Sequence, residues 1–436
     1  MFLCPWCHGS KKMLMPVTQT IYPPRSVLMY TLPIRRLRDM LKHIVPGVTL
    51  VSVEDLPSKR LPRLYSLNLS DGEQLLLSFA PSQAVRLLRH EQTLLSSEAI
   101  LIHFLASMAK PEPVQEKEQA EGSTTTSQAS QGTSLAHLIP KLVKHSSSTK
   151  EMGYPYTLFE PSIGEPLSNL LIYLSIPEQQ HVDKQLGLLV RELALISSPS
   201  GHFGPVSRVC SDPFAPAHAT SSVTPQGSTT WTCAFMSLAE GILRDGEDMS
   251  VVLPYEVIRD HFHRLAWRLN AVTTPRLLVI DAGDAANVLI EREPDEDGAP
   301  AMPGPRLTGL RDWSQGIFGD PLLSSPFENP SEGFLEGWKQ GNNEDIIEDV
   351  ESSATRLLLY RCYRATVNIV TEYYRPRPDS SRRELEGRRE LTNVLAELNK
   401  VDVKEGETPK RARSQSGSDA ESNESAKRQK IQEAQT

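Results

Sequence analysis

The segment from residue 276 to residue 291, RLLVIDAGDAANVLIE, constrains the fold of this chain more than any other segment. Both ends are apolar, whereas the centre holds two aspartates and an asparagine. Short apolar runs bounded by turn residues are typical of buried strands. A loop that carries Asp281, Asp284 and Asn287 between two such strands is either a polar turn that caps them or a loop that binds metal and phosphate. On this segment alone both interpretations stay open.

A second polar cluster follows in LTGLRDWSQGIFGDPLL. Asp312 comes after a short apolar strand over residues 307–310, and Asp320 lies in a Gly-Asp-Pro turn before a helix. Phosphoryl transfer needs an acid near the acceptor hydroxyl and oxygen ligands around Mg²⁺. Asp281, Asn287 and Asp312, each at a strand end, could supply these groups. The alternative is that Asp312 only caps a helix.

Composition and charge limit the class of protein. The 436 residues exceed one ordinary core, which predicts two lobes with tails. The net charge of −8 argues against a general nucleic-acid binder. No apolar run is long enough for a membrane span, and the N-terminus does not resemble a signal peptide. Five scattered cysteines predict reduced thiols in an intracellular protein, cytoplasmic or nuclear.

The CPWCH motif at the N-terminus is the first candidate for redox or metal chemistry. No strand precedes Cys4 and Cys7, and no second Cys-x-x-Cys pair completes a metal site. A frayed terminus is therefore the favoured interpretation, and the role of the pair stays open.

Periodicity divides the chain into a strand-rich first part and a helical second part. The sequence predicts a helix in IRRLRDMLKHIV, a hairpin that turns at Asp71-Gly72, a long helical stretch over residues 83–108, and helices from about residue 175 onward. The predicted organisation is an N-terminal extension (1–25), an N-lobe (26–157) with a disordered insertion at about 111–135, a helical C-lobe (158–378), a C-terminal helix (379–400) and a disordered tail (401–436).

The second cluster resembles the metal loop of the aminoglycoside phosphotransferase and choline-kinase-like branch of the protein-kinase superfold. That loop runs Gly-x-x-Asp-Trp and then Gly-Asp-Pro. The matching residues here are Gly309, Asp312, Trp313, Gly319, Asp320 and Pro321. The resemblance extends over roughly residues 60–375. It implies an α+β, two-lobed protein-kinase-like fold, with a small antiparallel-sheet N-lobe and a larger, mainly helical C-lobe.

The first cluster is similar to a variant of the family's catalytic loop, with one extra residue before the asparagine. The resemblance implies that Asp281 is the catalytic base, and Asp284 is the alternative if the loop is rearranged. Asn287 and Asp312 would be Mg²⁺ ligands, and Asp320 would fix the loop through hydrogen bonds.

The resemblance also implies a nucleotide site. The interlobe hinge, where the adenine of ATP would pack, is Leu158, Phe159 and Glu160. The family places a lysine on the third strand, paired with a helix glutamate. Here Ser78 occupies the lysine position, Glu98 stands at the glutamate position, and Glu91 is a rival for it. The loop LPSKRLPRL has no glycine to approach phosphates, so Lys59, Lys141 and Lys144 are the candidate replacements for the lysine.

Two functions follow from this pattern. The first is a Mg²⁺- and ATP-dependent phosphotransferase that acts on the hydroxyl of a small molecule. The second is a pseudokinase that keeps the fold as a binding or scaffold protein, possible because Ser78 replaces the lysine and Val279-Ile280 replace the histidine and glycine of the catalytic loop. The acceptor is not encoded in the motifs.

The C-terminal tail holds two basic groups, Lys410 to Arg413 and Lys427 to Lys430, with an acidic, serine-rich spacer between them. This arrangement resembles a bipartite nuclear import signal, which predicts an import carrier as partner. A solvated, mixed-charge tail is the alternative. No aromatic residues interleave with the basic ones, so direct binding of nucleic acid is not expected.

Overall fold

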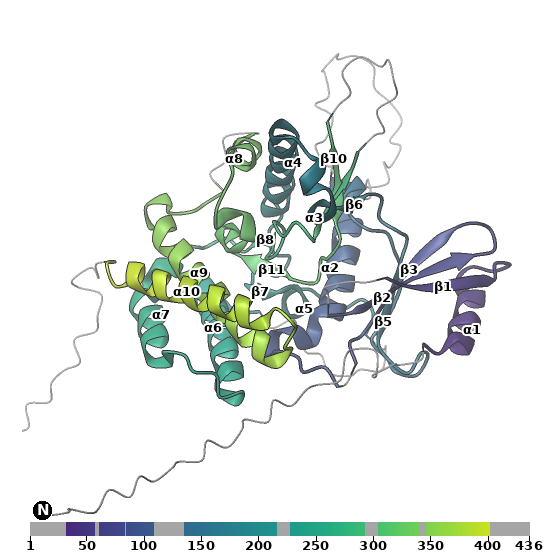
Figure 1. Cartoon of the computed structure of the whole chain (residues 1–436), viewed down its shortest axis with the longest axis horizontal. Coiled ribbons are helices and arrows are strands. Elements are labelled where there is room, and N and C mark those ends of the chain that lie inside the picture. Colours follow the sequence, from purple (N-terminus) through teal and green to yellow (C-terminus); the bar gives the residue numbers. More distant parts are fainter. Residues whose placement is uncertain are drawn as a thin grey trace, which may run out of the picture.

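The first five strands form one antiparallel sheet, in the order β1-β2-β3-β5-β4. The computed structural model describes residues 32–56, 61–82, 84–108, 135–215, 227–292, 304–340 and 346–401. Within them, the sheet consists of β1 (Leu50–Leu56), β2 (Arg63–Leu69), β3 (Gln74–Phe79), β4 (Leu142–Ser146) and β5 (Tyr156–Phe159). Gly72 makes the predicted β2–β3 turn with a φ of +89°, a conformation that glycine adopts without steric cost. Figure 1 shows this N-lobe at one end of the molecule.

The two faces of the sheet bury different cores. Leu75, Leu77 and Phe79 of β3 pack with helix α1 (Ile34–Ile44), which begins at the predicted residue and ends one residue earlier than predicted. Successive side chains of a strand point to opposite faces, so Leu76 and Ser78 lie on the other face. On that face Leu76 packs against the larger core, which includes α2 (Leu94–Met108).

The segment before α2 corrects the sequence-based expectation of one long helix over residues 83–108. Arg89–Thr93 forms a 3₁₀ helix, η2, and residues 84–88 are not helical. One cause is tertiary and one is local: the Arg89 backbone N–H donates to Asp245 at 2.9 Å, and the Leu88 N–H donates to the nearby Glu91 side chain at 2.8 Å. In a continuous helix these two N–H groups would instead donate to the backbone carbonyl oxygens four residues earlier.

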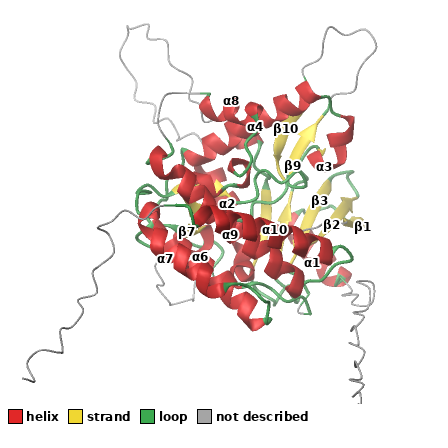
Figure 2. Cartoon of the chain, turned by 60° about the vertical axis from the view of Figure 1, so that its left-hand side comes forward, coloured by secondary structure: helices red, strands yellow, loops and turns green. Residues whose placement is uncertain are grey.

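The C-lobe is mainly helical. Its helices are α3 (Leu167–Leu170), α4 (Ile176–Ala194), α5 (Val206–Val209), α6 (Trp231–Asp248), α7 (Tyr255–Leu269), α8 (Glu332–Lys339), α9 (Val350–Tyr374) and α10 (Ser380–Leu398). Short 3₁₀ turns are η4 (Leu135–His137), η5 (Leu171–Tyr173), η6 (Pro321–Leu323) and η7 (Ser325–Phe327). Figure 2 shows α6 and α7 on the side of the molecule away from β1 and β2. None of the helices in the described ranges is both long and apolar enough to cross a membrane.

Two small three-stranded sheets in the C-lobe carry the polar loops. Their strands are β6 (Glu165–Pro166), β7 (Gly204–Pro205), β8 (Arg276–Val279), β9 (Val288–Glu291), β10 (Arg306–Leu310) and β11 (Gly316–Gly319). One sheet has the order β10-β9-β6 and the other β7-β11-β8. The strands β8 and β9 are therefore not partners, and the loop between them crosses from one sheet to the other.

A buried ion pair joins the loop after β11 to α9. Asp320 and Arg356 are 1% and 0% exposed, and Arg356 Nε donates to Asp320 Oδ2 at 2.8 Å. The Tyr360 hydroxyl donates to the same oxygen at 2.8 Å, and the indole N–H of Trp231 donates to that hydroxyl at 2.7 Å. Burial raises the pKa of Asp320, and Arg356 and Tyr360 oppose the shift. The hydrogen-bonding role expected for Asp320 matches this geometry.

Removing one partner of this pair leaves an uncompensated buried charge. We therefore expect Arg356→Met to lower the free energy of unfolding by about 3–5 kcal/mol in urea denaturation. Arg361 on the same helix is the control, because its partners Glu390 and Glu397 are partly exposed. Arg361→Met should cost about 1 kcal/mol or less. Equal losses in the two variants would contradict the expectation.

A buried histidine makes the N-lobe sensitive to acid. His145 on β4 is 7% exposed, lies 2.8 Å from the Thr157 hydroxyl, and contacts the ring of Phe214. Burial lowers the pKa of His145 to about 4, and Asp212 opposes the shift. In the unfolded chain the imidazole takes up a proton at about pH 6.5. The stability that the neutral His145 side chain contributes is therefore fully present above that pH and is lost as the pH falls toward 4.

We expect the native protein to lose about 2 kcal/mol more than His145→Gln between about pH 7 and pH 4.5. Urea denaturation of both proteins at the two pH values measures the difference. Parallel losses would show that His145 is not the group that titrates.

Candidate active site

A cleft of about 780 Å³ is lined by both lobes. The N-lobe contributes residues 61–62 and several residues between 84 and 94. The C-lobe contributes the two polar loops and the end of α9 with the turn after it. Asp281, Asp284, Asn287 and Asp312, which the sequence analysis selected, all line this cleft. The structure thus brings the two acidic clusters together, because β8 pairs with β11 and β9 pairs with β10.

Asn287 joins the two polar loops. Its amide Nδ2 lies 3.3 Å from the carbonyl oxygen of Asp281 and 3.2 Å from that of Asp312, and donates to both. Its Oδ1 accepts the N–H of Asp312 at 2.6 Å. Its backbone carbonyl accepts the N–H of Arg311 at 2.8 Å. The residue is 5% exposed, so these bonds are shielded from water and fix one loop against the other.

The three aspartates are held differently. Asp281 follows β8, is half-buried, and accepts from Gln315 Nε2 at 3.4 Å. Asp284 is exposed, and its carboxylate accepts the N–H of Ala286 at 2.9 Å. The Asp312 carboxylate accepts the N–H of Ser314 at 2.8 Å. Asp284 and Asp312 therefore each accept a backbone N–H of a local turn, and both also line the cleft. The turn cap considered for Asp284 is present, whereas the described residues directly after Asp312 form no helix, so the helix cap considered there was wrong.

The structure places Glu98 and Ser78 away from the cleft. Glu98 on α2 is 1% exposed, and its Oε1 accepts the N–H of Trp313 at 3.3 Å. Helix α2 is thereby bonded to the residue directly after Asp312. Ser78 is 0% exposed and lies on the sheet face that packs toward α2. Neither residue is part of the cleft lining.

The expected hinge is also outside the cleft. Leu158 and Phe159 are buried, one in each core, and the Glu160 N–H donates to the Lys141 carbonyl at 2.9 Å. Lys141 forms an ion pair with Glu160 at 2.5 Å, and Lys144 forms one with Glu151 at 2.9 Å. Neither lysine lines the cleft. The third candidate, Lys59, lies outside the described residues, as do Cys4 and Cys7, most of the predicted insertion and the basic tail.

Four arginines line the cleft, and sequence reasoning missed all of them: Arg86, Arg311, Arg375 and Arg377. Arg375 binds the Glu91 carboxylate through both terminal nitrogens at 2.6 Å and also donates to the Arg86 carbonyl at 3.0 Å. The available signals were the Arg-Pro-Arg sequence between two helices and an arginine just before Asp312. Burial lowers the pKa of the neighbouring His90, so it adds no positive charge at neutral pH.

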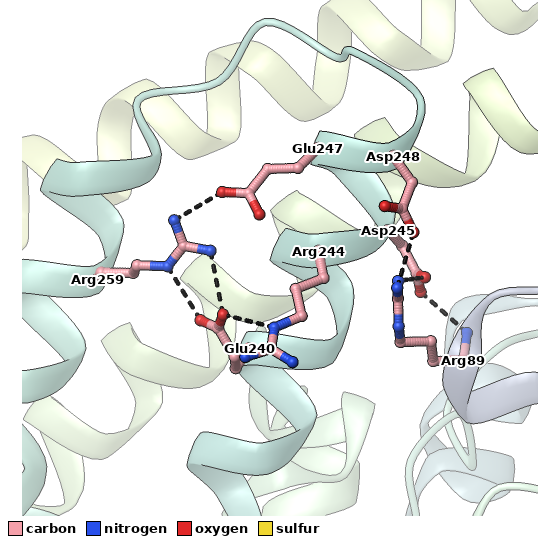
Figure 3. Close-up of polar contacts among 7 residues, drawn as sticks. All are labelled: Arg89, Glu240, Arg244, Asp245, Glu247, Asp248 and Arg259. Carbon is pink, nitrogen blue, oxygen red and sulfur yellow. Dashed lines mark hydrogen bonds and ion pairs between the residues drawn. The ribbon is translucent and has the colours of Figure 1, made fainter.

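An ion-pair network fastens the segment before α2 to the C-lobe. Arg89 pairs with Asp245 and, at 2.7 Å, with Asp248, both at the end of α6 (Figure 3). The Tyr374 hydroxyl donates to Asp245 at 3.3 Å. In the same view, Arg259 of α7 braces α6 through Glu240 and Glu247. The network fixes the start of α2, which carries Glu98.

The donor set fits a magnesium ion better than a closed metal centre. In the part of the chain that the structure describes, no three His, Cys, Asp or Glu side chains are arranged to hold a metal. Asp281 and Asp312 nevertheless line one cleft, and Asn287 offers an amide oxygen beside them. Mg²⁺ in phosphate-transfer sites is held by one or two carboxylates, with substrate phosphates and water completing the shell. The residues present therefore fit this ion.

Loss of the Asn287 amide should loosen both loops. We expect Asn287→Ala to cost about 2–4 kcal/mol of unfolding free energy, because buried backbone groups lose their partners. Urea denaturation measures the cost, and amide hydrogen exchange at Asp312 and Trp313 localises it. The exposed Asn169, which lines the same cleft, is the control, and Asn169→Ala should stay within about 0.5 kcal/mol. A matching loss in both variants would refute the bridging role.

Comparison with known proteins agrees with this architecture. No model of a protein family matches the sequence, and no curated protein matches it. Solved structures do match. A protein described as an aminoglycoside phosphotransferase of Ralstonia eutropha JMP134 has a TM-score of 0.52 at 10% identity, over 85% of this chain and 100% of that one. A protein described as a fructosamine-3-kinase of Thermobifida fusca has a TM-score of 0.49 at 13% identity, over 84% of this chain and 99% of that one.

A ternary complex of APH(2″)-IIa with streptomycin and ATP has a TM-score of 0.47 at 15% identity, over 85% of this chain and 99% of that one. At such identities only the fold is shared. The antiparallel N-terminal sheet and the helical C-terminal part confirm the predicted fold class. This chain therefore has the α+β, two-lobed, kinase-like fold of the aminoglycoside phosphotransferases.

Proposed function

We propose that this chain is a phosphotransferase that moves a phosphoryl group from Mg²⁺-bound ATP to a hydroxyl of a small molecule. One observation carries the proposal: Asp281 and Asp312 line the same cleft although they follow strands of different sheets, and Asn287 joins their loops. The fold shared with the Ralstonia eutropha protein supports it.

Asp281 is the proposed catalytic base. It is half-buried at the end of β8, whereas its rival Asp284 is exposed and caps its own turn. The Asp281 carboxylate would accept the proton of the acceptor hydroxyl. The hydroxyl oxygen then bonds to the γ-phosphorus, and the bond between that phosphorus and the departing ADP oxygen breaks. Positioning and electrostatic compensation, more than covalent chemistry, lower the barrier of such a transfer.

Asp312 and Asn287 are the proposed Mg²⁺ ligands. The amide oxygen of Asn287 accepts one N–H, that of Asp312, and a carbonyl oxygen has two lone pairs. The ion, when bound, would neutralise charge on the phosphates. Arg311 precedes Asp312 and lines the cleft, and we assign it to the same phosphates in place of the lysine that Ser78 replaces.

A pseudokinase with a binding or scaffold role is the second candidate. The specific observation in its favour is that three of the four residues expected at the ATP site are buried: Glu98, Leu158 and Phe159 are each 3% exposed or less. Glu98 already bonds Trp313. The basic tail, which lies outside the described residues, stays a prediction of an import carrier as partner and of a cytoplasmic or nuclear location.

Turnover separates the two candidates. We expect Mg²⁺-dependent ATP consumption by the full chain, measured as ADP release over a panel of hydroxyl acceptors. Asp281→Asn should lower kcat by about 10²- to 10⁴-fold, the usual contribution of a general base. Asp284→Asn on the same loop is the matched control and should change kcat little.

Asp312→Asn should abolish the thermal shift that Mg-ATP produces in the native protein. Circular dichroism checks that each variant is folded. If the folded native protein binds no ATP at millimolar concentration, the pseudokinase replaces the enzyme. If Asp284→Asn is as damaging as Asp281→Asn, the base is assigned to the wrong residue.

A further inference from the structure

The charges that line the cleft are divided between two regions. Three carboxylates, those of Asp281, Asp284 and Asp312, belong to the polar loops. Three arginines, Arg86, Arg375 and Arg377, belong to the segment before α2 and the turn after α9. These two segments are in direct contact, because Arg375 donates to the Arg86 carbonyl at 3.0 Å. Two further charges do not follow this division: Arg311 lies on a polar loop, and Glu91 lies among the arginines, where it binds Arg375. The cleft thus has a mainly acidic region around the proposed chemistry and a mainly basic region.

The three arginines of the basic region are not equally available to a ligand. Arg375 is only 19% exposed, and Glu91 binds it through both terminal nitrogens. Arg86 is exposed, and its Nη1 donates to the Met249 sulfur at 3.0 Å. A thioether is a weak acceptor, and in the described ranges no carboxylate forms an ion pair with Arg86.

The positive charge of Arg377 is also only partly neutralised by carboxylates. Its Nη2 reaches Glu372 at 3.3 Å, and its side chain is 37% exposed. Glu372 is itself nearly buried and accepts shorter bonds from Arg383, at 2.9 Å, and from the Ser380 hydroxyl, at 2.5 Å. Most of the Glu372 charge is therefore committed elsewhere, and the donors of the Arg377 guanidinium remain largely unused.

We propose that Arg86 and Arg377 bind an anionic group, a phosphate or a carboxylate, on the hydroxyl-bearing acceptor. A guanidinium presents a planar fork of donors that matches these oxyanions, and Lys or neutral side chains do not reproduce it. The acceptor is then an acidic hydroxy compound, for example a phosphorylated sugar or polyol. A polyamine-type acceptor is disfavoured, because its cations would face guanidinium groups. The assignment of the anionic group to an acceptor rests on the proposed function. Binding of an anion by the two arginines does not depend on turnover.

The phosphates of the nucleotide are a second possible ligand for Arg86 and Arg377. The positions of the two arginines in the chain favour the acceptor. Arg311 adjoins Asp312 on the metal-type loop and is already assigned to the nucleotide. Arg86 and Arg377 come from segments that belong to neither polar loop. A nucleotide-free binding experiment and a competition experiment separate the two sources.

The experiment uses the full chain and three matched probes: glucose 6-phosphate, glucose and glucosamine. Titration calorimetry without nucleotide should detect glucose 6-phosphate and find much weaker binding of glucose and glucosamine. Arg86→Gln and Arg377→Gln should each raise the Kd for glucose 6-phosphate about tenfold or more, the usual effect of losing a charge-assisted hydrogen bond. Arg86→Lys should be intermediate, because it keeps the charge and loses the fork.

Arg389→Gln is the matched control, because Arg389 is exposed on α10 and does not line the cleft. Its Kd should equal that of the native protein. The affinity should also survive saturation with magnesium and a non-hydrolysable ATP analogue. All the arginines changed are exposed, so folding should persist, and circular dichroism checks it.

Three results would overturn the proposal: no binding of glucose 6-phosphate, an equal Kd in the Arg86, Arg377 and Arg389 variants, or displacement of the probe by the ATP analogue. The last result would assign both arginines to the nucleotide. Arginine-dependent binding of the probe in a protein that never consumes ATP would refute the phosphotransferase and leave the anion site standing.

Discussion

One asparagine amide holds the candidate site together. The loops that carry Asp281 and Asp312 both run between the same two sheets, because β8 pairs with β11 and β9 pairs with β10. Beyond these strand pairs, the side chain of Asn287 ties the loops to each other, with two donated bonds and one accepted bond to the backbone of both loops. Because these bonds are buried, they do not compete with water, and the spacing of the two carboxylates is set by a rigid unit. Everything proposed for the cleft depends on that spacing.

The fold was predictable where local pattern decides it. The bounds of α1 and the Asp71-Gly72 turn follow from periodicity and turn chemistry, which act over a few residues. The separation of β8 and β9 into different sheets was not predictable. Their sequence reads like a hairpin, and only the positions of β10 and β11 separate them into two sheets. Likewise, residues 84–88 have a helical pattern, but contacts with Glu91 and, through Arg89, with Asp245 hold this segment in another conformation.

The acidic residues of the candidate site were predictable from the sequence, and the arginines were not. The acidic residues occur in compact motifs, so their spacing identifies them. The arginines that face them come from connections far apart in sequence, and only the folded chain brings Arg86 and Arg377 to one cleft. The buried glutamate shows a second limit. Motif position selected Glu98, but its partner in the described structure is the backbone N–H of Trp313, which no sequence pattern encodes.

The Asp320–Arg356 pair has a consequence for how the protein is made. Asp320 is synthesised before Arg356, because it lies 36 positions earlier in the sequence. Until α9 has been synthesised, a nascent chain that packed the β11 loop would enclose a carboxylate without its cation, which is strongly unfavourable. The C-lobe can therefore close only after α9 has been synthesised. A protein shortened before α9 would keep both acidic motifs in its sequence and yet be unable to assemble them into a site.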